Sequence, residues 1–171
     1  MMKNDLVETV ALKNEKLLEF FVKIEQEGQE FYKKLARHIS DPVVKGYLLL
    51  MSGDEAEHEK NFKLILGGEE DRKFGWEDNP AIGEFVDAHR LEGIFPDLDE
   101  ILADLPEFEG IQKALYIALK SEELAFEFYK ALVESCDDFE TKMLMIEMES
   151  EEKGHCAYIQ NLIDGLEKKD S

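Results

Sequence analysis

One pattern of glutamate and histidine residues occurs twice in this chain, and it constrains the fold more than any other feature. A Glu is followed 30 positions later by Glu-x-x-His, and the whole pattern returns 97 positions further on. The six residues are Glu25, Glu55, His58, Glu122, Glu152 and His155. Neighbouring residues repeat with them, as EFYK at 30–33 and at 127–130. The repeated unit, about 50 residues long, indicates two copies of a two-helix element.

Apolar residues recur at steps of three and four along four segments, and all six residues lie within these rows. The rows are Leu18, Phe21, Glu25, Gly28, Tyr32 and Leu35; Leu48, Met51, Glu55, His58, Phe62 and Ile65; Leu115, Ala118, Glu122, Ala125, Tyr129 and Leu132; Met145, Met148, Glu152, His155, Ile159 and Leu162. Such spacing is typical of the buried side of a packed helix. We therefore expect four long helices, at approximately 8–39, 42–66, 107–136 and 138–167.

Tight turns at Asp41-Pro42 and Asp137-Asp138 would fold each pair of helices into a hairpin, with the aspartates as N-caps. Glu25 lies 16 residues before Asp41 and Glu55 lies 14 after it, so the two come level in an antiparallel hairpin. The second hairpin has the same spacing around Asp138. The carboxylates are therefore predicted to meet at one height in the bundle.

Four carboxylates in one core would be strongly destabilising if nothing neutralised them. A buried unpaired charge costs several kcal/mol, against a total stability of roughly 5–15 kcal/mol for a typical domain. A single Glu-x-x-His is a weak signal in a chain with 40 Asp and Glu residues, but two triplets on apolar rows are specific. Four carboxylates and two imidazoles suit two divalent ions, iron first, with manganese or zinc as possible substitutes.

The segments IEQEGQEFYKKLA, DEAEHEKNF, SEELAFEFYKALV and ESEEKGHCAYI resemble the ferritin-like diiron-carboxylate family, most closely the rubrerythrin-type branch without a rubredoxin domain. The resemblance implies an all-α, ferritin-like four-helix bundle with one long crossover between helices 2 and 3. It implies a diiron centre in which Glu55 and Glu152 bridge the two metal ions and Glu25 and Glu122 are terminal ligands. His58 and His155 would each complete the coordination of one ion. We expect a single domain over 1–171, with hairpins at about 10–66 and 107–165 joined by the crossover 67–106.

The crossover should contain a short helix near Ala81–Leu91, preceded by Pro80. Phe74 and Trp76 are expected to pack it on the bundle, although a contact with another subunit is a second interpretation. His38 and His89 are expected to face solvent.

Tyr32 and Tyr129 follow Glu25 and Glu122 by seven residues, two turns along the same rows. They could simply fill the core, but we favour a hydrogen bond from each hydroxyl to a ligand carboxylate. Gly28 and Ala125, one turn past the same glutamates, either leave room for a small oxidant or allow close helix packing.

Composition excludes several classes of protein. A net charge of −20 argues against nucleic acid and anionic membranes as partners, and no apolar run approaches 18 residues. The N-terminal MMKNDLVETV lacks an apolar signal core, and Cys136 and Cys156 lack CxxC spacing, which favours free thiols and a cytoplasmic location. By similarity to the family we expect a homodimer to which the Phe74–Leu105 region contributes.

These features favour a non-haem diiron oxidoreductase that reduces hydrogen peroxide or O₂ with electrons from a separate donor protein. The alternatives are ferrous iron oxidation for iron handling, and a structural or partner-binding bundle that metals only stabilise. Rubrerythrins carry an extra carboxylate one turn from the third-helix ligand, where this chain has Leu119 and Ala125 around Glu122. That departure keeps peroxidase and ferroxidase chemistry both open.

Overall fold

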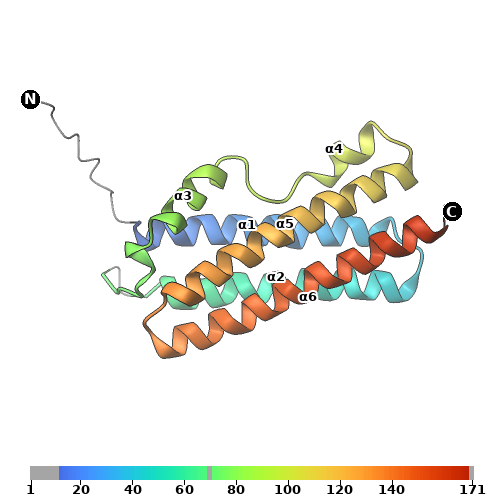
Figure 1. Ribbon diagram of the computed structural model, residues 1–171. Coiled ribbons are helices and arrows are strands. Elements are labelled where there is room, and N and C mark those ends of the chain that lie inside the picture. Colours follow the sequence, from blue (N-terminus) through green and yellow to red (C-terminus); the bar gives the residue numbers. More distant parts are fainter. Residues whose placement is uncertain (1–11, 69–70, 170–171) are drawn as a thin grey trace, which may run out of the picture.

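A computed structural model describes residues 12–68 and 71–169 and contains four long helices. They are α1 (Asn14–Arg37), α2 (Pro42–Leu66), α5 (Glu107–Ser135) and α6 (Phe139–Lys169), joined by a crossover with η1 (Trp76–Asp78), α3 (Pro80–His89) and α4 (Leu98–Ala103). Figure 1 shows the four long helices lying along one another, with the crossover running over one side. The all-α four-helix bundle predicted from the repeat is confirmed.

The helix bounds differ from the predicted ones mainly at the start of α1. Residues 8–11 of the first predicted helix lie outside the described residues, and α1 begins at Asn14 because Lys13 has extended backbone angles. Asn14 donates a side-chain hydrogen bond of 2.7 Å to the Arg72 carbonyl, which ties this end of the helix to the crossover. The other three long helices agree with the prediction to within about two residues, the usual uncertainty of a helix end.

Both hairpin turns are capped as predicted. The Asp41 carboxylate accepts hydrogen bonds from Val43 N at 2.9 Å and Val44 N at 3.1 Å, while Pro42 occupies the first turn, where it needs no donor. The Asp138 carboxylate accepts from Thr141 N at 3.0 Å in the second hairpin. Each cap fixes the level at which one hairpin reverses, and therefore the level at which its glutamates meet.

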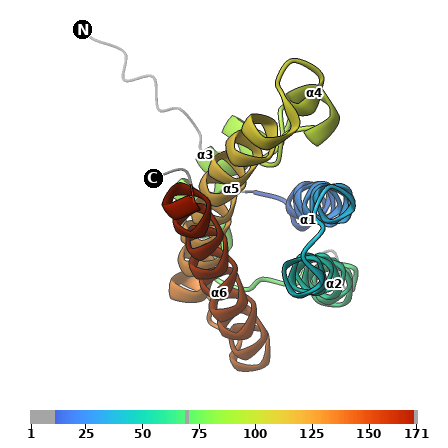
Figure 2. The same cartoon turned by 90° about the vertical axis from the view of Figure 1, so that its right-hand side faces the viewer.

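The two hairpins lie side by side, and the crossover covers the side formed by α1 and α5. Viewed along the bundle, α1 pairs with α2 and α5 with α6, while α4 lies over the α1–α5 side (Figure 2). Phe74 and Trp76 are buried and stack with ring centroids 4.5 Å apart, in the same apolar cluster as Leu17, Phe128 and Met145. The first interpretation of these aromatics, packing on the bundle, is confirmed.

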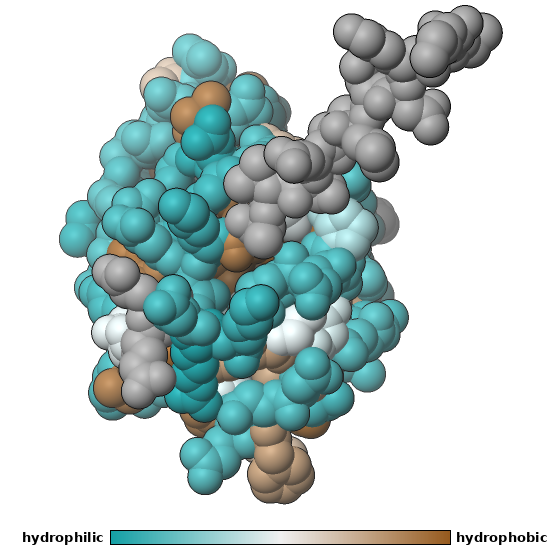
Figure 3. Space-filling model, turned by 90° about the vertical axis from the view of Figure 1, so that its left-hand side faces the viewer, coloured by the Kyte–Doolittle hydropathy of each residue, from teal (hydrophilic) through white to brown (hydrophobic). Residues whose placement is uncertain are grey.

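The large apolar side chains of Phe74–Leu105 point mostly inward, with Leu91 exposed. Large exposed apolar residues of α2 and α6 include Val43, Tyr47, Leu50, Phe139 and Met143. The end of the bundle seen in Figure 3 is mainly hydrophilic, with apolar residues in small patches. The homodimer and its contact remain predictions.

Two apolar clusters fill the bundle, one toward each end. The first includes Phe20, Phe21 and Phe62, and the second includes Phe31, Leu48 and Ile159. Between them lies a polar layer containing all six residues of the repeated pattern, each at most 5% exposed. No helix of the described chain is both long and apolar enough to cross a membrane.

Removal of the Asp41 cap tests the turn that determines the level at which Glu25 and Glu55 meet. Asp41→Ala leaves two backbone donors at the start of α2 without an acceptor and should lower the free energy of unfolding by about 1 kcal/mol. Urea unfolding of the metal-free protein would measure it, with exposed Ser40→Ala as the matched control. Equal midpoints for the two variants would contradict the capping role.

Candidate metal centre

The six predicted ligands come from four helices and reach the same layer of the bundle. Glu25 is on α1 and Glu122 on α5, each near the middle of its helix. The other four, Glu55 and His58 on α2 and Glu152 and His155 on α6, occupy consecutive turns. Because a helix turns once in 3.6 residues, the i, i+3 spacing places each Glu and His on one face, pointing inward.

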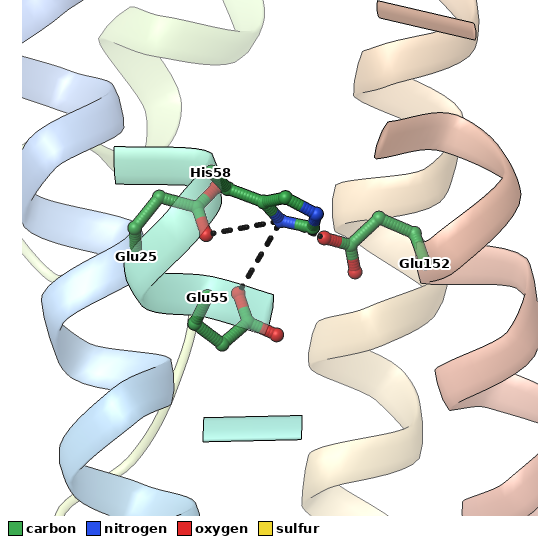
Figure 4. Close-up of side chains that lie close together, drawn as sticks. All are labelled: Glu25, Glu55, His58 and Glu152. Carbon is green, nitrogen blue, oxygen red and sulfur yellow. Dashed lines mark ion pairs between the residues drawn. The ribbon is translucent and has the colours of Figure 1, made fainter. Parts of the chain in front are cut away.

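The six side chains form two overlapping groups. Glu25, Glu55, His58 and Glu152 offer ligand atoms that all lie within 4.8 Å of one another, and so do Glu55, Glu122, Glu152 and His155. Figure 4 shows the first group pointing to a common centre from α1, α2 and α6. Glu55 and Glu152 belong to both groups, which is the arrangement needed for two carboxylates to bridge a pair of ions.

The imidazoles direct their Nδ1 atoms into this centre. His58 Nδ1 lies 3.0 Å from Glu152 Oε1 and 3.5 Å from Glu25 Oε2. His155 Nδ1 lies 3.2 Å from Glu55 Oε1 and 3.6 Å from Glu122 Oε2. These atoms are close, but they are not aligned as hydrogen bonds.

Unpaired polar atoms at the centre fit metal ions. Seven buried atoms of the six residues lack a hydrogen-bond partner: Glu25 Oε2, Glu55 Oε1, His58 Nδ1, Glu122 Oε2, both Glu152 carboxylate oxygens and His155 Nδ1. Buried polar atoms are normally satisfied, so a cluster of this size without partners needs an explanation. Two dications bound to oxygen and nitrogen ligands would satisfy all seven.

Comparison with known proteins agrees with this geometry. The rubrerythrin family model matches residues 16–97, a span that contains the first Glu and the first Glu-x-x-His. A Thermotoga maritima protein described as a candidate ferritin-like diiron-carboxylate protein superposes with a TM-score of 0.65 over 90% of this chain and 96% of its own, at 21% identity. The first part of this chain is therefore similar to the rubrerythrin family, and the whole chain has a ferritin-like fold.

A hypothetical protein from Pyrococcus furiosus is also similar, at 26% identity and a TM-score of 0.67, over 96% of this chain and 94% of that one. A search of curated proteins finds no match. The family model ends before α5, so Glu122, Glu152 and His155 rest on the internal repeat and on their geometry.

The two tyrosines of the bundle bond to Glu25 and Glu122, each to the glutamate of the other hairpin. The Tyr32 hydroxyl on α1 donates to Glu122 Oε1 on α5, and the Tyr129 hydroxyl on α5 donates to Glu25 Oε1 on α1. Both tyrosines are fully buried. Burial and the neighbouring carboxylates raise the pKa of each hydroxyl well above its usual value, so each remains a donor. The hydrogen bonds predicted for these tyrosines are present.

Two further acidic residues hold the histidines, and the sequence analysis missed them. Glu151 Oε2 lies 2.7 Å from His58 Nε2, and Asp54 Oδ2 lies 3.2 Å from His155 Nε2. Each acid precedes the Glu of its own Glu-x-x-His but binds the histidine of the other hairpin. Both side chains are partly exposed, so charge there is less costly than in the core. Asp54 and Glu151 are separated by the repeat offset of 97 positions, and this was the sequence signal that could have identified them.

This arrangement fixes the tautomer and the orientation of each ring. A carboxylate that accepts from Nε2–H leaves Nδ1 with its lone pair toward the centre, as a metal ligand requires. The contact at Nε2 also explains why each imidazole keeps its orientation toward the centre although its Nδ1 atom has no hydrogen-bond partner. Asp54 and Glu151 therefore act as positioning residues for the predicted ligands.

Without metal, the centre must hold protons. Burial and the charge of Glu152 raise the pKa of Glu122 to about 8. Burial together with Glu152, Glu25 and Glu122 raises the pKa of Glu55 well above its usual value. Burial opposes charge on His58 and His155 too, but their carboxylate partners outweigh it and raise the pKa of both rings. Contacts with the two histidines lower the pKa of Glu152 despite its burial, so it retains the charge.

The remaining candidates lie outside the centre. His38 is exposed and His89 is partly exposed against Phe85, while neither Cys136 nor Cys156 joins either group. A Cβ added at Gly28 would lie 3.2 Å from Glu55 Cγ, so this glycine permits close packing and does not leave open room. This decides between the two interpretations of Gly28.

Stability of the metal-free protein should fall as the pH rises from about 5 to 8. In this range folded Glu122 keeps a proton that the unfolded chain, with a pKa near 4.5, releases, and Glu55 and both histidines act in the same direction. Each such proton contributes a slope of at most about 1.4 kcal/mol per pH unit. Urea unfolding at several pH values would measure this slope.

Added Zn²⁺ or Fe²⁺ should reverse this pH dependence, because metal replaces the protons and binds more tightly as the pH rises. Metal-free stability that is constant or increasing between pH 5 and 8 would contradict the proposed protonation of the centre.

Loss of either positioning carboxylate should weaken metal binding without removing a ligand. Glu151→Ala and Asp54→Ala are each expected to lower affinity about 10- to 100-fold, as is usual for acids that bond a metal-bound histidine. Titration with Co²⁺, followed by visible absorption, would measure the affinity. Glu147→Ala, at an exposed position one turn before Glu151, is the matched control, and equal affinities for all three variants would refute the role.

Proposed function

We propose that this protein is a non-haem diiron oxidoreductase that reduces hydrogen peroxide or O₂ with electrons from a separate donor protein. The observation that supports it most is the pair of overlapping ligand groups sharing Glu55 and Glu152, buried and facing one centre. Six protein ligands for two ions would leave coordination positions on the ions at which a small oxidant could bind. Two ferrous ions bound there would supply two electrons, and reduction of H₂O₂ takes up two electrons and two protons to give two waters.

The residues of the chain would supply the metal ligands, hold these ligands in their orientation and exclude bulk water from the metal centre. Glu55 and Glu152 are proposed as bridging ligands, Glu25 and Glu122 as terminal ligands, and His58 and His155 as one nitrogen ligand for each ion. Carboxylates suit a redox centre because they can change between bridging and terminal binding as the charge changes. Tyr32 and Tyr129 donate to the terminal carboxylates and so hold one oxygen of each in place.

A second candidate is oxidation of ferrous iron as a substrate, for iron handling. Leu119 and Ala125, one turn either side of Glu122, leave α5 without the extra carboxylate found in rubrerythrins. A net charge of −20 would also concentrate ferrous ions near the protein. Peroxide consumed in stoichiometric two-electron steps would favour the first function, whereas oxidation of many ferrous ions per chain would favour the second. A bound but inert metal pair would leave only a structural role.

The cellular setting is part of the proposal. We infer a cytoplasmic homodimer, because the family members that this chain resembles pair about a two-fold axis. The two cysteines of this sequence are too few for a rubredoxin-type four-cysteine site, so electrons would come from a separate protein or reductant. Light scattering that showed a monomer at tens of micromolar, a working range for weak association, would contradict the dimer.

Removal of both bridging residues is the sharpest test of the site. Glu55→Ala with Glu152→Ala should abolish binding of the metal pair and all two-electron oxidation. The metal-free bundle should be at least as stable as the wild type, because buried like charges are lost. Iron analysis after anaerobic loading and stopped-flow mixing with peroxide would measure both effects.

The matched control removes two exposed glutamates from the same helices, as Glu57→Ala with Glu147→Ala, and should bind two irons normally. A bridging double variant that retained two tightly bound irons and full peroxide reduction would show that the site is assigned wrongly.

A further inference from the structure

The crossover holds one short segment directly against the layer that contains the metal centre. The Glu27 carboxylate on α1 accepts a hydrogen bond from Ile94 N at 3.1 Å, and the Ser121 hydroxyl on α5 donates to the Ile94 carbonyl at 2.7 Å. Gly93 has a φ of 76°, and a Cβ there would collide with the Glu27 carboxylate. Both helices therefore bind the segment at the point where it crosses between them.

This attachment positions the next residue, Phe95, over the centre. A Cβ built at Gly28 would lie 3.2 Å from Phe95 Cε2 and 3.2 Å from Glu55 Cγ, so the ring and the bridging glutamate meet across this glycine. The Phe95 ring also contacts the Tyr32 ring edge-on, with centroids 5.7 Å apart. The inner side of Phe95 therefore touches the surroundings of a proposed bridging ligand.

The same residue also borders the molecular surface. Phe95 lines a surface hollow of about 300 Å³ that is bordered by Phe31, Pro96 and Leu98 and by the charged residues Glu27, Glu30, Lys34, Glu92 and Asp97. Only 8% of Phe95 is exposed, so it closes the floor of the hollow. Phe95 therefore lies between this hollow and the side chains that pack around Glu55.

Polar and apolar side chains cover the other sides of the layer. On the α2–α6 side, His58 and His155 occupy the space and are held there by Glu151 and Asp54. Toward each end of the bundle lie the two apolar clusters, which include the stacked rings of Phe21 and Phe62. The Phe95 side combines a surface hollow with an apolar ring that packs beside a predicted ligand.

We propose that the hollow is the access site for the oxidant, and that the Phe95 ring sets the upper size limit of the peroxide that reaches the metals. The preferred substrates are then H₂O₂ and O₂, and organic hydroperoxides are excluded. Reduction of an organic hydroperoxide, ROOH + 2H⁺ + 2e⁻ → ROH + H₂O, takes its electrons from the reduced metal pair as H₂O₂ does. Size therefore separates the two substrates, since the chemistry is the same. The substrate assignment rests on the proposed function, but access past Phe95 does not.

The test compares Phe95→Ala with Phe85→Ala. Phe85 is also an aromatic of the crossover and stacks on Phe128, with centroids 4.4 Å apart, but the contacts of its ring do not include a predicted ligand. Single-turnover oxidation of the diferrous protein would be followed with H₂O₂ and with tert-butyl hydroperoxide. Phe95→Ala should raise the ratio of the tert-butyl hydroperoxide rate to the H₂O₂ rate about tenfold or more, a change typical of opening a pocket by several carbon atoms. Phe85→Ala should leave that ratio unchanged.

A second readout needs no turnover. Azide binding to the Co²⁺-loaded protein, followed by visible absorption, should become faster in Phe95→Ala than in wild type or Phe85→Ala. Phe95→Leu keeps an apolar cover of smaller cross-section and should give intermediate values in both assays, which keeps the test usable if the alanine variant folds poorly.

The two proposals fail in different ways. If no peroxide oxidises the wild-type protein but azide binding still depends on residue 95, the proposed function is wrong and the access route stands. If H₂O₂ is reduced but all variants share the wild-type peroxide ratio and azide rate, the function stands and Phe95 is only a packing residue. Equal changes in Phe95→Ala and Phe85→Ala would also overturn the access route, because they indicate general loosening of the crossover.

Discussion

Burial of four carboxylates and two imidazoles in one layer of a helical core is the constraint on which the rest of the structure depends. Such a layer is strongly unfavourable unless protons or metal ions balance its charge. The bundle supports it with apolar clusters on both sides and with four partners outside the ligand set: Tyr32, Tyr129, Asp54 and Glu151. The site therefore costs stability in the metal-free protein and should regain it on binding metal, which links folding to metal supply.

The repeated pattern was sufficient to predict the bundle, its hairpin turns and the convergence of the six residues. Periodicity placed each residue on a buried face, and the spacing from Asp41 placed Glu25 and Glu55 at one level. The start of the first helix was placed too early because the apolar and polar pattern before Asn14 does not show where the backbone becomes extended.

Other features could not be predicted because they depend on contacts between distant segments. The crossed pairing of Tyr32 with Glu122 is set by how the hairpins face each other, which no local pattern specifies. Asp54 and Glu151 were hidden because acidic residues are abundant and these two are partly exposed. Phe95 was one aromatic among several in a long connection, and only the hydrogen bonds of Ile94 to α1 and α5 show where it packs.

The crossed contacts also bear on how such a site could arise. The Tyr32 hydroxyl donates to Glu122 and the Tyr129 hydroxyl donates to Glu25. Glu151 is hydrogen-bonded to His58, and Asp54 is hydrogen-bonded to His155. Every supporting contact therefore passes from one hairpin to the other, and neither hairpin could assemble a complete centre alone. Two identical copies of one hairpin, related to each other by a two-fold axis, would make all of these contacts. Fusion of a duplicated gene would then preserve an existing centre, with the crossover added afterwards as a cover for one side.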